Sequence, residues 1–438
     1  MLTWQRLRIF VPKSLVGSSL YGALGLAGAT IYLLAAETTR IETQLRPEGI
    51  CGFLISINLY VLIQVVGCGF VERRRIATLA FGIATVVSSL LLVSVRPSFG
   101  FVAIVALLPV GALLLQRGWT REKIVLSVAS AATAALLFLP EHFLARNDEI
   151  SKTFLPTMLF VIHANLIRDQ MAADLKENAN VPYPRDWLER VHTALSAEIA
   201  KSHAAHPRRY RLLGFDPEYL WFNESSIAAQ LRRKFGNNVP GRCAFYRFYY
   251  WRTWQHRPLD QLKKVGRQIC VYYFPKCRAY RPMKVWPLTD DYQRGVTSLD
   301  FSEYRQITKS LPLAEDFWQR TTSLAHTAPV VEQPRLLRLT LLLLAACYLP
   351  WLLLALVLSG ITFWRPAHWN HLRWLGVLVV FGFAYNGASC LEVAIINSLE
   401  VYRYITAQMY ATLLTQLLAL WLILEFAFAM RRQQYGDT

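Results

Sequence analysis

The sequence has few of the patterns that mark soluble enzymes and binding modules. No P-loop, GxSxG, HExxH or GxGxxG pattern stands on a suitable element. There is also no CxxC pair, no zinc-ligand spacing, no internal repeat and no low-complexity tract. Nothing therefore points to a nucleotide-binding enzyme, a zinc module or a repeat protein. We expect no cofactor and no metal site, although a divalent cation stays open.

The chain has long apolar runs instead. Of its 438 residues, 54% are hydrophobic, and the mean hydropathy is +0.27. A membrane-spanning helix needs about 20 mostly apolar residues. Eight segments are apolar over about that length: 17–36, 50–70, 76–95, 98–115, 123–140, 337–363, 374–391 and 405–430. The first lacks a clear cleavage site and another span follows it closely, so it is not expected to be a signal peptide. The sequence therefore predicts an all-α polytopic membrane protein with about eight transmembrane helices.

The predicted spans divide the chain into three parts. Residues 1–140 hold five helices, residues 141–336 form a mostly helical segment outside the membrane, and residues 337–438 hold three helices. We call residues 141–336 the insert. Within it, SSIAAQLRRKFG at 225–236 predicts a short helix with a serine cap and a glycine stop.

Lysine and arginine in the short loops divide unequally between the two sides of the predicted membrane. Thirteen lie on the side that holds both termini, and four lie on the other: Arg40, Arg46, Arg96 and Arg403. Cytoplasmic loops carry the excess of basic residues. We therefore expect both termini in the cytoplasm and the insert on the periplasmic side of a bacterial inner membrane.

The formal net charge of +18 would suggest a nucleic-acid partner in a soluble protein. The predicted topology argues against that partner, because it places the insert outside the membrane. Residues 201–284 of the insert alone hold 18 basic and 4 acidic residues. Outside a membrane, such a surface can meet anionic lipid headgroups or phosphorylated glycolipids. It can equally be a solvated face beside the bilayer. Membrane lipids are thus the expected partners, and a protein partner stays unknown.

The insert opens with TFLPTMLFVIHANLIRDQMAADL at 153–175. Its apolar core is only about 14 residues long, which is short for a span. It also carries His163, Arg168 and Asp169. This pattern favours an interfacial or re-entrant helix, and we take the three polar residues as candidates for an acceptor-binding or interface surface.

A stretch rich in aromatic residues and arginines follows at 241–275. It predicts two helices, about 244–256 and 259–273, because Pro258 would break or kink a continuous one. The first is aromatic almost all round, and Arg247 and Arg252 are interleaved. Aromatic–arginine mixtures suit the bilayer interface. We therefore expect the pair to form the membrane-facing floor of the insert, with both arginines as further acceptor or interface candidates.

Three of the seven cysteines lie in the insert, on the side where oxidation can occur. If the two predicted helices fold as a hairpin, Cys243 comes near Cys270 or Cys277, and one disulfide can form. The other four cysteines lie in the predicted spans, where we expect them to be packing residues.

Polar residues at the mouths of the spans are functional candidates, because ionisable groups are costly there. The first outer loop, 35–50, holds Glu37, Glu42 and Glu48. A carboxylate at this boundary could act as general base for an acceptor hydroxyl. These glutamates could also merely solvate the loop.

Two arginines mark the other outer loops. Arg96 precedes a proline, and Arg403 stands between two tyrosines in SLEVYRYITAQMY at 398–410. Arginine offers a planar fork for phosphate oxygens. The alternatives for Arg403 are a snorkelling anchor or an ion pair with Glu400.

Three stretches resemble one family when taken together, in their order and membrane placement. They are SVRPSFGFVAIVALLP at 94–109, FYRFYYWRTWQHRPLDQLKKVGRQICVYYFP at 245–275 and FAYNGASCLEVAIINSLEVYRYITAQMYATLL at 383–414. The family is the GT-C-type integral-membrane glycosyltransferases, which are protein-mannosyltransferase-like or aminoarabinose-transferase-like. The resemblance implies transfer of a hexosyl or pentosyl group from a polyprenyl-phosphate donor to an envelope glycoconjugate at the outer membrane face. It also implies that Arg403 and Tyr404 bind the donor phosphate, with Arg96 as a weaker second ligand.

The chain departs from the family pattern at its start. Family members carry a catalytic acid, usually aspartate, in a first outer loop, with more helices before the Arg–Pro segment. Here three spans precede Arg96, and loop 35–50 holds glutamate but no aspartate. We therefore expect a chain that is short at its N-terminus. The acid is then missing, supplied by a partner, or replaced by Glu37, Glu42 or Glu48.

Two alternatives to an active transferase stay open. One is an inactive relative that binds lipid-linked glycans or partner proteins. The other is a transporter or polymerase of such lipids, which should have charged or broken helices at the bilayer midplane. The predicted spans lack these features apart from Asn58, Gln64 and Asn386, which counts against a transporter.

Overall fold

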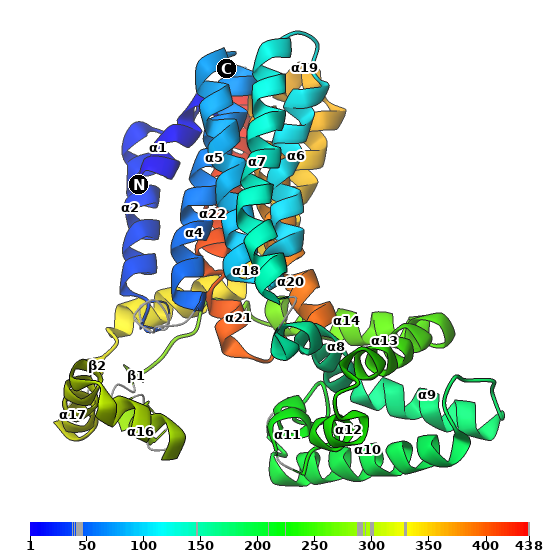
Figure 1. Cartoon of the computed structure of the whole chain (residues 1–438). Helices are drawn as coiled ribbons and strands as arrows, with labels where there is room; N and C mark the ends of the chain where they lie inside the picture. Colours follow the sequence, from blue (N-terminus) through cyan, green and yellow to red (C-terminus); the bar gives the residue numbers. More distant parts are fainter. Residues whose placement is uncertain are drawn as a thin grey trace.

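The protein is an all-α membrane protein (Figure 1). The computed structural model describes the chain except residues 37, 39, 41–46, 146–147, 209, 224, 287–291, 294, 298–301, 328–330 and 437–438. Within these limits, seven helical segments are long and apolar enough to cross a membrane. They are α4 with η2 (Pro47–Val66, Gly67–Val71), α5 (Arg75–Val95), η3 with α6 (Pro97–Phe99, Gly100–Leu115), α7 (Thr120–Ala145), α18 (Arg335–Trp364), α19 to α20 (Pro366–Trp369, η4 Asn370–Leu372, Arg373–Ile396) and α22 (Met409–Gly436).

The first predicted span is the shortest. It forms α2 (Ser18–Leu34), a 17-residue apolar helix that packs against α22. The chain before it forms α1 (Leu2–Leu7) and η1 (Arg8–Phe10). Together with the seven longer helices, α2 confirms the predicted polytopic fold.

The spanning helices expose large apolar side chains on their outward faces. On α7, Leu136 is 76% exposed, and Leu144 is exposed to the same degree; Leu343 and Val357 do likewise on α18. Such exposure would be an aggregation liability in water, but it is the expected surface of a helix that faces lipid. Each spanning helix is thus apolar on the face that packs in the bundle and on the face that points outward. For this reason the apolar runs in the sequence are long and uninterrupted.

Polar side chains inside the bundle are paired with one another. The Asn58 amide donates to the hydroxyls of Ser88 and Ser89, at 2.9 Å each, and accepts from the Tyr385 hydroxyl at 2.9 Å. These bonds join α4 to α5 and α20. A buried amide with this many partners stabilises helix packing, so Asn58 has a structural role here.

The insert begins with a bent pair of helices. α8 (Glu149–Ile162) and α9 (Ala164–Lys176) meet at His163 with an angle of 76°. The apolar residues are concentrated in α8 and the charged residues in α9. Segment 153–175 therefore does not continue as one straight span, which agrees with an interfacial or re-entrant segment.

The core of the insert is rich in aromatic residues. α10 (Arg185–Ala205), α11 (Pro217–Phe222), α12 (Ile227–Phe235) and α13 (Val239–His256) pack with α8 and α9. Helix α12 has the predicted Ser226 cap and ends at Gly236. Phe245, Tyr246 and Tyr249 of α13 are buried in this core. These rings of α13 therefore fill the centre of the insert, while Arg247 and Trp251 lie on its exposed side, and the membrane-facing role of α13 stays a prediction.

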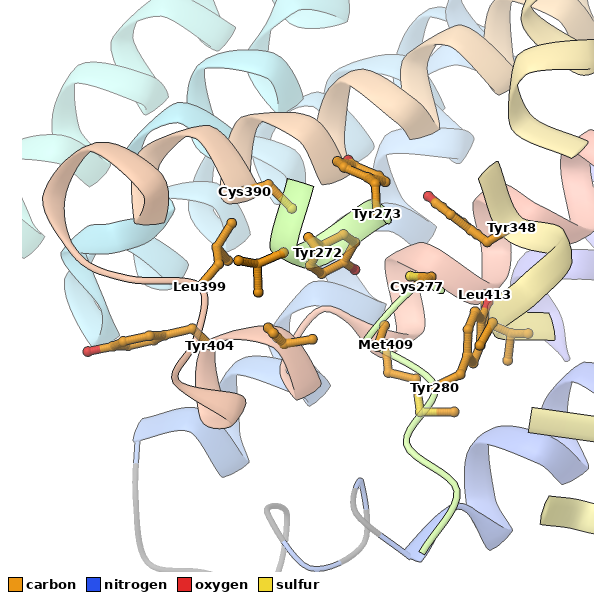
Figure 2. Packing of buried hydrophobic residues seen from close by; sticks show 14 of the residues in the cluster. Tyr272, Tyr273, Cys277, Tyr280, Tyr348, Cys390, Leu399, Tyr404, Met409 and Leu413 are labelled. Carbon is orange, nitrogen blue, oxygen red and sulfur yellow. The ribbon is translucent and has the colours of Figure 1, made fainter. Parts of the chain in front are cut away.

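Helix α14 (Pro258–Tyr273) connects the insert to the membrane bundle. It starts at the predicted break, with Pro258 in its first turn. Its last residues, Tyr272 and Tyr273, are buried among α18, α20 and α22 (Figure 2). They bond to Asn386, ten residues before the end of α20. Ten residues of helix at 1.5 Å per residue place this contact about 15 Å from the end of α20, so α14 extends along α20 by about that length.

A smaller unit follows α14. It contains α16 (Ser302–Ser310), α17 (Pro312–Thr327) and an antiparallel pair of two-residue strands, β1 (Val285–Trp286) and β2 (Val331–Glu332). Arg305 joins the two helices, because it forms an ion pair with Glu315 and lies over the ring of Trp318.

The cysteines stay unpaired. All seven belong to the described residues, and each is a free thiol. Cys243 Sγ faces the Lys152 carbonyl of α8 at 3.7 Å, whereas Cys277 is buried in the bundle cluster of Figure 2. The conditional prediction of an insert disulfide therefore fails, because Cys243 is buried beside α8, Cys270 is exposed on α14, and Cys277 is buried in the bundle.

Candidate functional site

The short helix α21 (Tyr402–Thr406) lies between the end of α20 and the start of α22, at the bundle end that meets the insert (Figure 1). The turn that leads into it is held by α14. The Gln268 side-chain oxygen accepts hydrogen bonds from the Ser398 hydroxyl at 2.9 Å and the Leu399 N–H at 2.8 Å. Gln268 is buried, so this bond pair fixes the path of the chain toward α21.

Lys264 holds the same turn one helical turn earlier on α14. Its Nζ donates to the carbonyl oxygens of Ala394 at 2.7 Å and Asn397 at 3.3 Å. These carbonyls belong to the end of α20, where a basic group is favourable for the helix dipole. Burial lowers the pKa of Lys264 to about 7. Part of the side chain stays accessible, and both carbonyls favour the charged form, so these two effects act against that lowering.

Two of the predicted phosphate ligands meet at one aromatic ring. The guanidinium carbon of Arg96 lies 4.3 Å from the centre of the Tyr404 ring, and that of Arg403 lies 5.2 Å from it. Tyr404 is buried, and its hydroxyl accepts from the Asn397 side-chain amide. Figure 2 shows Tyr404 on α21 beside the buried cluster. The π system of the ring attracts cations, so each guanidinium has a favourable contact at Tyr404.

A third arginine lies at the same short helix. The guanidinium carbon of Arg281 lies 4.1 Å from the centre of the Tyr402 ring. Arg96 comes from the corner between α5 and η3, Arg281 follows α14, and Arg403 belongs to α21 itself. Three separate segments therefore bring guanidinium groups to α21, and that concentration of positive charge suits an anionic headgroup.

Two carboxylates near α21 bind backbone N–H groups. Glu400 accepts from the N–H groups of Leu212 and Leu213, at 3.1 Å each, and so ties the insert to the α20–α21 turn. Glu392 accepts from the Phe101 N–H at 2.6 Å, at the start of α6. Each carboxylate thus satisfies a backbone donor that would otherwise lack a partner.

The three glutamates expected to act as catalytic acids are not placed. Glu37 and Glu42 lie outside the described residues. Glu48 falls in the first turn of α4, and only its backbone is described. Their role therefore stays a prediction.

The candidates at the start of the insert lie together. His163, Arg168 and Asp169 line one cavity of about 350 Å³ between α9, the loop 212–215 and α14. Arg168 forms an ion pair with Asp169 at 2.8 Å. The remaining wall includes Lys264, whose Nζ also supports the turn toward α21. The cavity and α21 therefore share one structural lysine.

The two arginines of α13 are in different surroundings. Arg247 is exposed to solvent. Arg252 forms a two-bond ion pair with Asp174 of α9, with both N–O distances at 2.8 Å. Asp174 is only 2% exposed in its side chain. Arg252 therefore links two helices inside the insert, and its role toward an acceptor stays a prediction.

Sequence reasoning missed Lys264, Gln268 and Arg281. A signal existed for the first two, because Gln261, Lys264 and Gln268 follow one another at spacings of three and four on one helical face. That face packs against α20. No local pattern marked Arg281, since its contact with Tyr402 depends on tertiary structure. In the described ranges, no group of three or more His, Cys, Asp and Glu has the arrangement of a metal site.

Comparison with protein-family models, curated proteins and solved structures gives no match for this chain. Function must therefore be argued from the site itself.

Proposed function

We propose that the chain is a membrane glycosyltransferase that uses a polyprenyl-phosphate sugar and binds the donor phosphate at α21. The observation that carries this proposal is the approach of Arg96 and Arg403 to the same Tyr404 ring. The proposal places α21 and the insert on the outer face of a bacterial inner membrane, where the acceptor is an envelope glycoconjugate. The unequal loop charges support that orientation.

The arrangement supports phosphate binding better than simple anchoring. A snorkelling arginine extends alone toward water, along the lipid-facing side of its helix. Here two arginines from distant segments converge on a buried ring, and a third lies over the neighbouring Tyr402. Holding like charges together costs free energy unless an anion or π face compensates for it. A lipid-linked phosphate at the bilayer boundary supplies such an anion.

In the proposed reaction, an acceptor hydroxyl attacks the anomeric carbon of the donor sugar. A carboxylate of Glu37, Glu42 or Glu48 takes the hydroxyl proton. The new bond joins the acceptor oxygen to the anomeric carbon, and the bond from that carbon to the phosphate oxygen breaks with inversion. The electron pair leaves with the polyprenyl phosphate, whose negative charge Arg403 and Arg96 stabilise.

Donor binding tests the phosphate site directly. Full-length protein in lipid nanodiscs should bind polyprenyl phosphate more tightly than the polyprenol of the same chain length. Replacing Arg403 with alanine should weaken phosphate binding about 10- to 100-fold, because it removes charge-assisted hydrogen bonds. Arg365→Ala, an exposed arginine at the α18–α19 corner, is the matched control and should bind normally. Equal affinity for phosphate and alcohol would reject the site.

Turnover separates an active transferase from an inactive relative. In cells that lack the endogenous protein, wild-type chain should restore a glycolipid or glycan product. A variant with Glu37, Glu42 and Glu48 all changed to glutamine should bind polyprenyl phosphate but form no product. If this triple variant forms product at the wild-type rate, the acid does not come from loop 35–50.

A further inference from the structure

The cavity of the insert has an excess of basic groups at its wall. Three bases and two acids line it: Arg168, Lys264, Arg267, Asp169 and Asp260. Both acids have basic neighbours. Asp169 forms an ion pair with Arg168 at 2.8 Å, and Asp260 lies 3.5 Å from Lys263 outside the cavity. Among the described residues, Lys264 and Arg267 form no ion pair. The cavity therefore retains the charge of Arg267 for a ligand, together with that of Lys264 when Lys264 is protonated.

The backbone adds to this positive character. Helix α9 begins at Ala164, and Asn165 in its first turn lines the cavity. No side chain caps this N-terminus. Helix N-termini carry partial positive charge and bind anions. The C-terminus of α8 directly precedes α9 and carries the opposite partial charge, so this contribution is smaller than that of Lys264 and Arg267.

His163 supplies a neutral acceptor at the same wall. It is 2% exposed, and its Nδ1 lies 2.8 Å from the Leu159 carbonyl oxygen, so Nδ1 carries the proton and donates. Its Nε2 is buried and has no hydrogen-bond partner among the described residues. A buried acceptor of this kind is costly without a partner, and a ligand hydroxyl would supply one.

The cavity has room for more than a bare ion. A water molecule takes about 30 Å³ of liquid volume, so 350 Å³ exceeds the need of a single phosphate several-fold. The volume is at the lower end of small-molecule sites, which start at about 300 Å³. Asn165, Asp169 and Asp260 at the wall can bond hydroxyl groups. A sugar-sized body with one anionic group fits these features.

We propose that this cavity binds a small phosphorylated sugar, with Lys264 and Arg267 at the phosphate and His163 Nε2 accepting from a hydroxyl. The site is separate from the three arginines at α21 and does not depend on the donor-binding proposal. Lys264 connects the two regions, because the same Nζ bonds to the end of α20. Arg267 is exposed and makes no described contact that folding needs, so it is the better residue to change.

Calorimetry on full-length protein in nanodiscs tests the site with three probes: inorganic phosphate, glucose 1-phosphate and glucose. Glucose 1-phosphate should bind most tightly, phosphate more weakly, and glucose not measurably. Arg267→Gln should lower the affinity for glucose 1-phosphate about tenfold or more. Arg233→Gln, an exposed arginine of α12 away from the cavity, should leave it unchanged.

Three results would overturn the proposal. One is equal binding of glucose and glucose 1-phosphate, and another is no binding of either phosphate. The third is binding that Arg403→Ala abolishes and Arg267→Gln leaves intact, because that binding belongs to α21. His163→Phe gives an independent check: it should weaken glucose 1-phosphate binding and leave phosphate binding unchanged, since inorganic phosphate stays at Lys264 and Arg267 and only the sugar ring places a hydroxyl at Nε2. Equal effects on both probes would contradict the assigned role of His163.

Discussion

The Arg96 guanidinium lies 4.3 Å from the centre of the Tyr404 ring, and this contact joins the α5–η3 corner to α21. Arg96 also donates from Nε to the Ser98 hydroxyl at 3.0 Å, which fixes the direction of its side chain. Tyr404 is in turn held by the Asn397 amide at its hydroxyl. The guanidinium and the ring are therefore both oriented before any ligand arrives, which lowers the ordering cost of binding.

Removing the Tyr404 ring should weaken the proposed phosphate site without removing a charge. Cation–π contacts contribute about 0.5–2 kcal/mol each. Tyr404→Leu should therefore lower affinity for polyprenyl phosphate roughly 3- to 30-fold, measured on full-length protein in nanodiscs. Tyr404→Phe keeps the ring and loses only the bond to Asn397, so its affinity should stay near wild type. If leucine binds as well as phenylalanine, the ring does not organise the two arginines.

The insert offers a matched comparison of two Arg–Asp pairs. Arg252 and Asp174 have side chains that are 15% and 2% exposed, whereas Arg320 and Asp316 are 75% and 53% exposed. Asp174→Ala leaves a buried charge unpaired and should destabilise the insert by about 3–5 kcal/mol. Asp316→Ala should cost less than about 1 kcal/mol. Amide hydrogen exchange over α9 and α13 measures the first effect; similar protection in both variants would contradict it.

The sequence predicted the membrane helices well because their signal is local. A run of about 20 apolar residues has few possible structures other than a membrane-spanning helix. The break at Pro258 and the cap at Ser226 are local in the same sense. Each depends on backbone chemistry within one or two turns, so no tertiary contact could change it.

The role of α13 was harder to predict because its composition fits two environments. Tyrosine and arginine suit the bilayer interface, but tyrosine also fills cores when its hydroxyl finds a partner. The packing of Phe245 and Tyr249 with residues of α8, α9 and α10 shows that one face of α13 belongs to the core of the insert. Likewise, Lys263 and Lys264 are adjacent in sequence, yet only Lys264 reaches the end of α20. Such differences arise from tertiary packing and have no local signature.

Asn386 should be the most sensitive polar residue of the bundle. Its side-chain oxygen accepts from the Tyr273 hydroxyl at 2.8 Å, and its amide nitrogen lies 3.0 Å from the Tyr272 and Gln408 oxygens. Asn386→Leu removes one partner from each of these buried groups, although the Tyr272 hydroxyl keeps Thr412 and the Gln408 oxygen keeps Cys390. Each buried group that is left unsatisfied costs about 1–3 kcal/mol. The end of α14 should then separate from the bundle more easily.

Thiol labelling of Cys277 measures that separation, because Cys277 is buried beside Tyr272 in the same cluster (Figure 2). Labelling in detergent should be faster in Asn386→Leu, and the thermal midpoint lower. Thr340→Val is the control, since Thr340 is half-buried and its hydroxyl bonds within α18. Unchanged labelling in Asn386→Leu would argue that α14 is held by apolar packing alone.

Lys264 should make stability depend on pH above neutrality. Its pKa is lowered from 10.5 to about 7 in the folded protein, so the unfolded chain binds more protons between these values. Stability should then rise with pH across that window, and the cost of the buried charge is fully present below pH 7. The slope is at most about 1.4 kcal/mol per pH unit. The two carbonyl acceptors and the partly accessible side chain reduce it.

Thermal unfolding in detergent between pH 7.5 and 9.5 measures this effect as the difference between wild type and a Lys264 variant, because the free thiols titrate in the same window and are common to both proteins. The groups that face Lys264 across the cavity are His163, Arg168, Asp169, Asp260 and Arg267. In the unfolded chain, histidine and aspartate titrate below this window and arginine above it. Lys264→Met should therefore flatten the rise in midpoint that wild-type protein shows. Lys263→Met, a 65% exposed neighbour, should keep the wild-type slope. Parallel curves for Lys264→Met and wild type would mean that Lys264 stays charged in the folded protein, held by the carbonyl oxygens of Ala394 and Asn397.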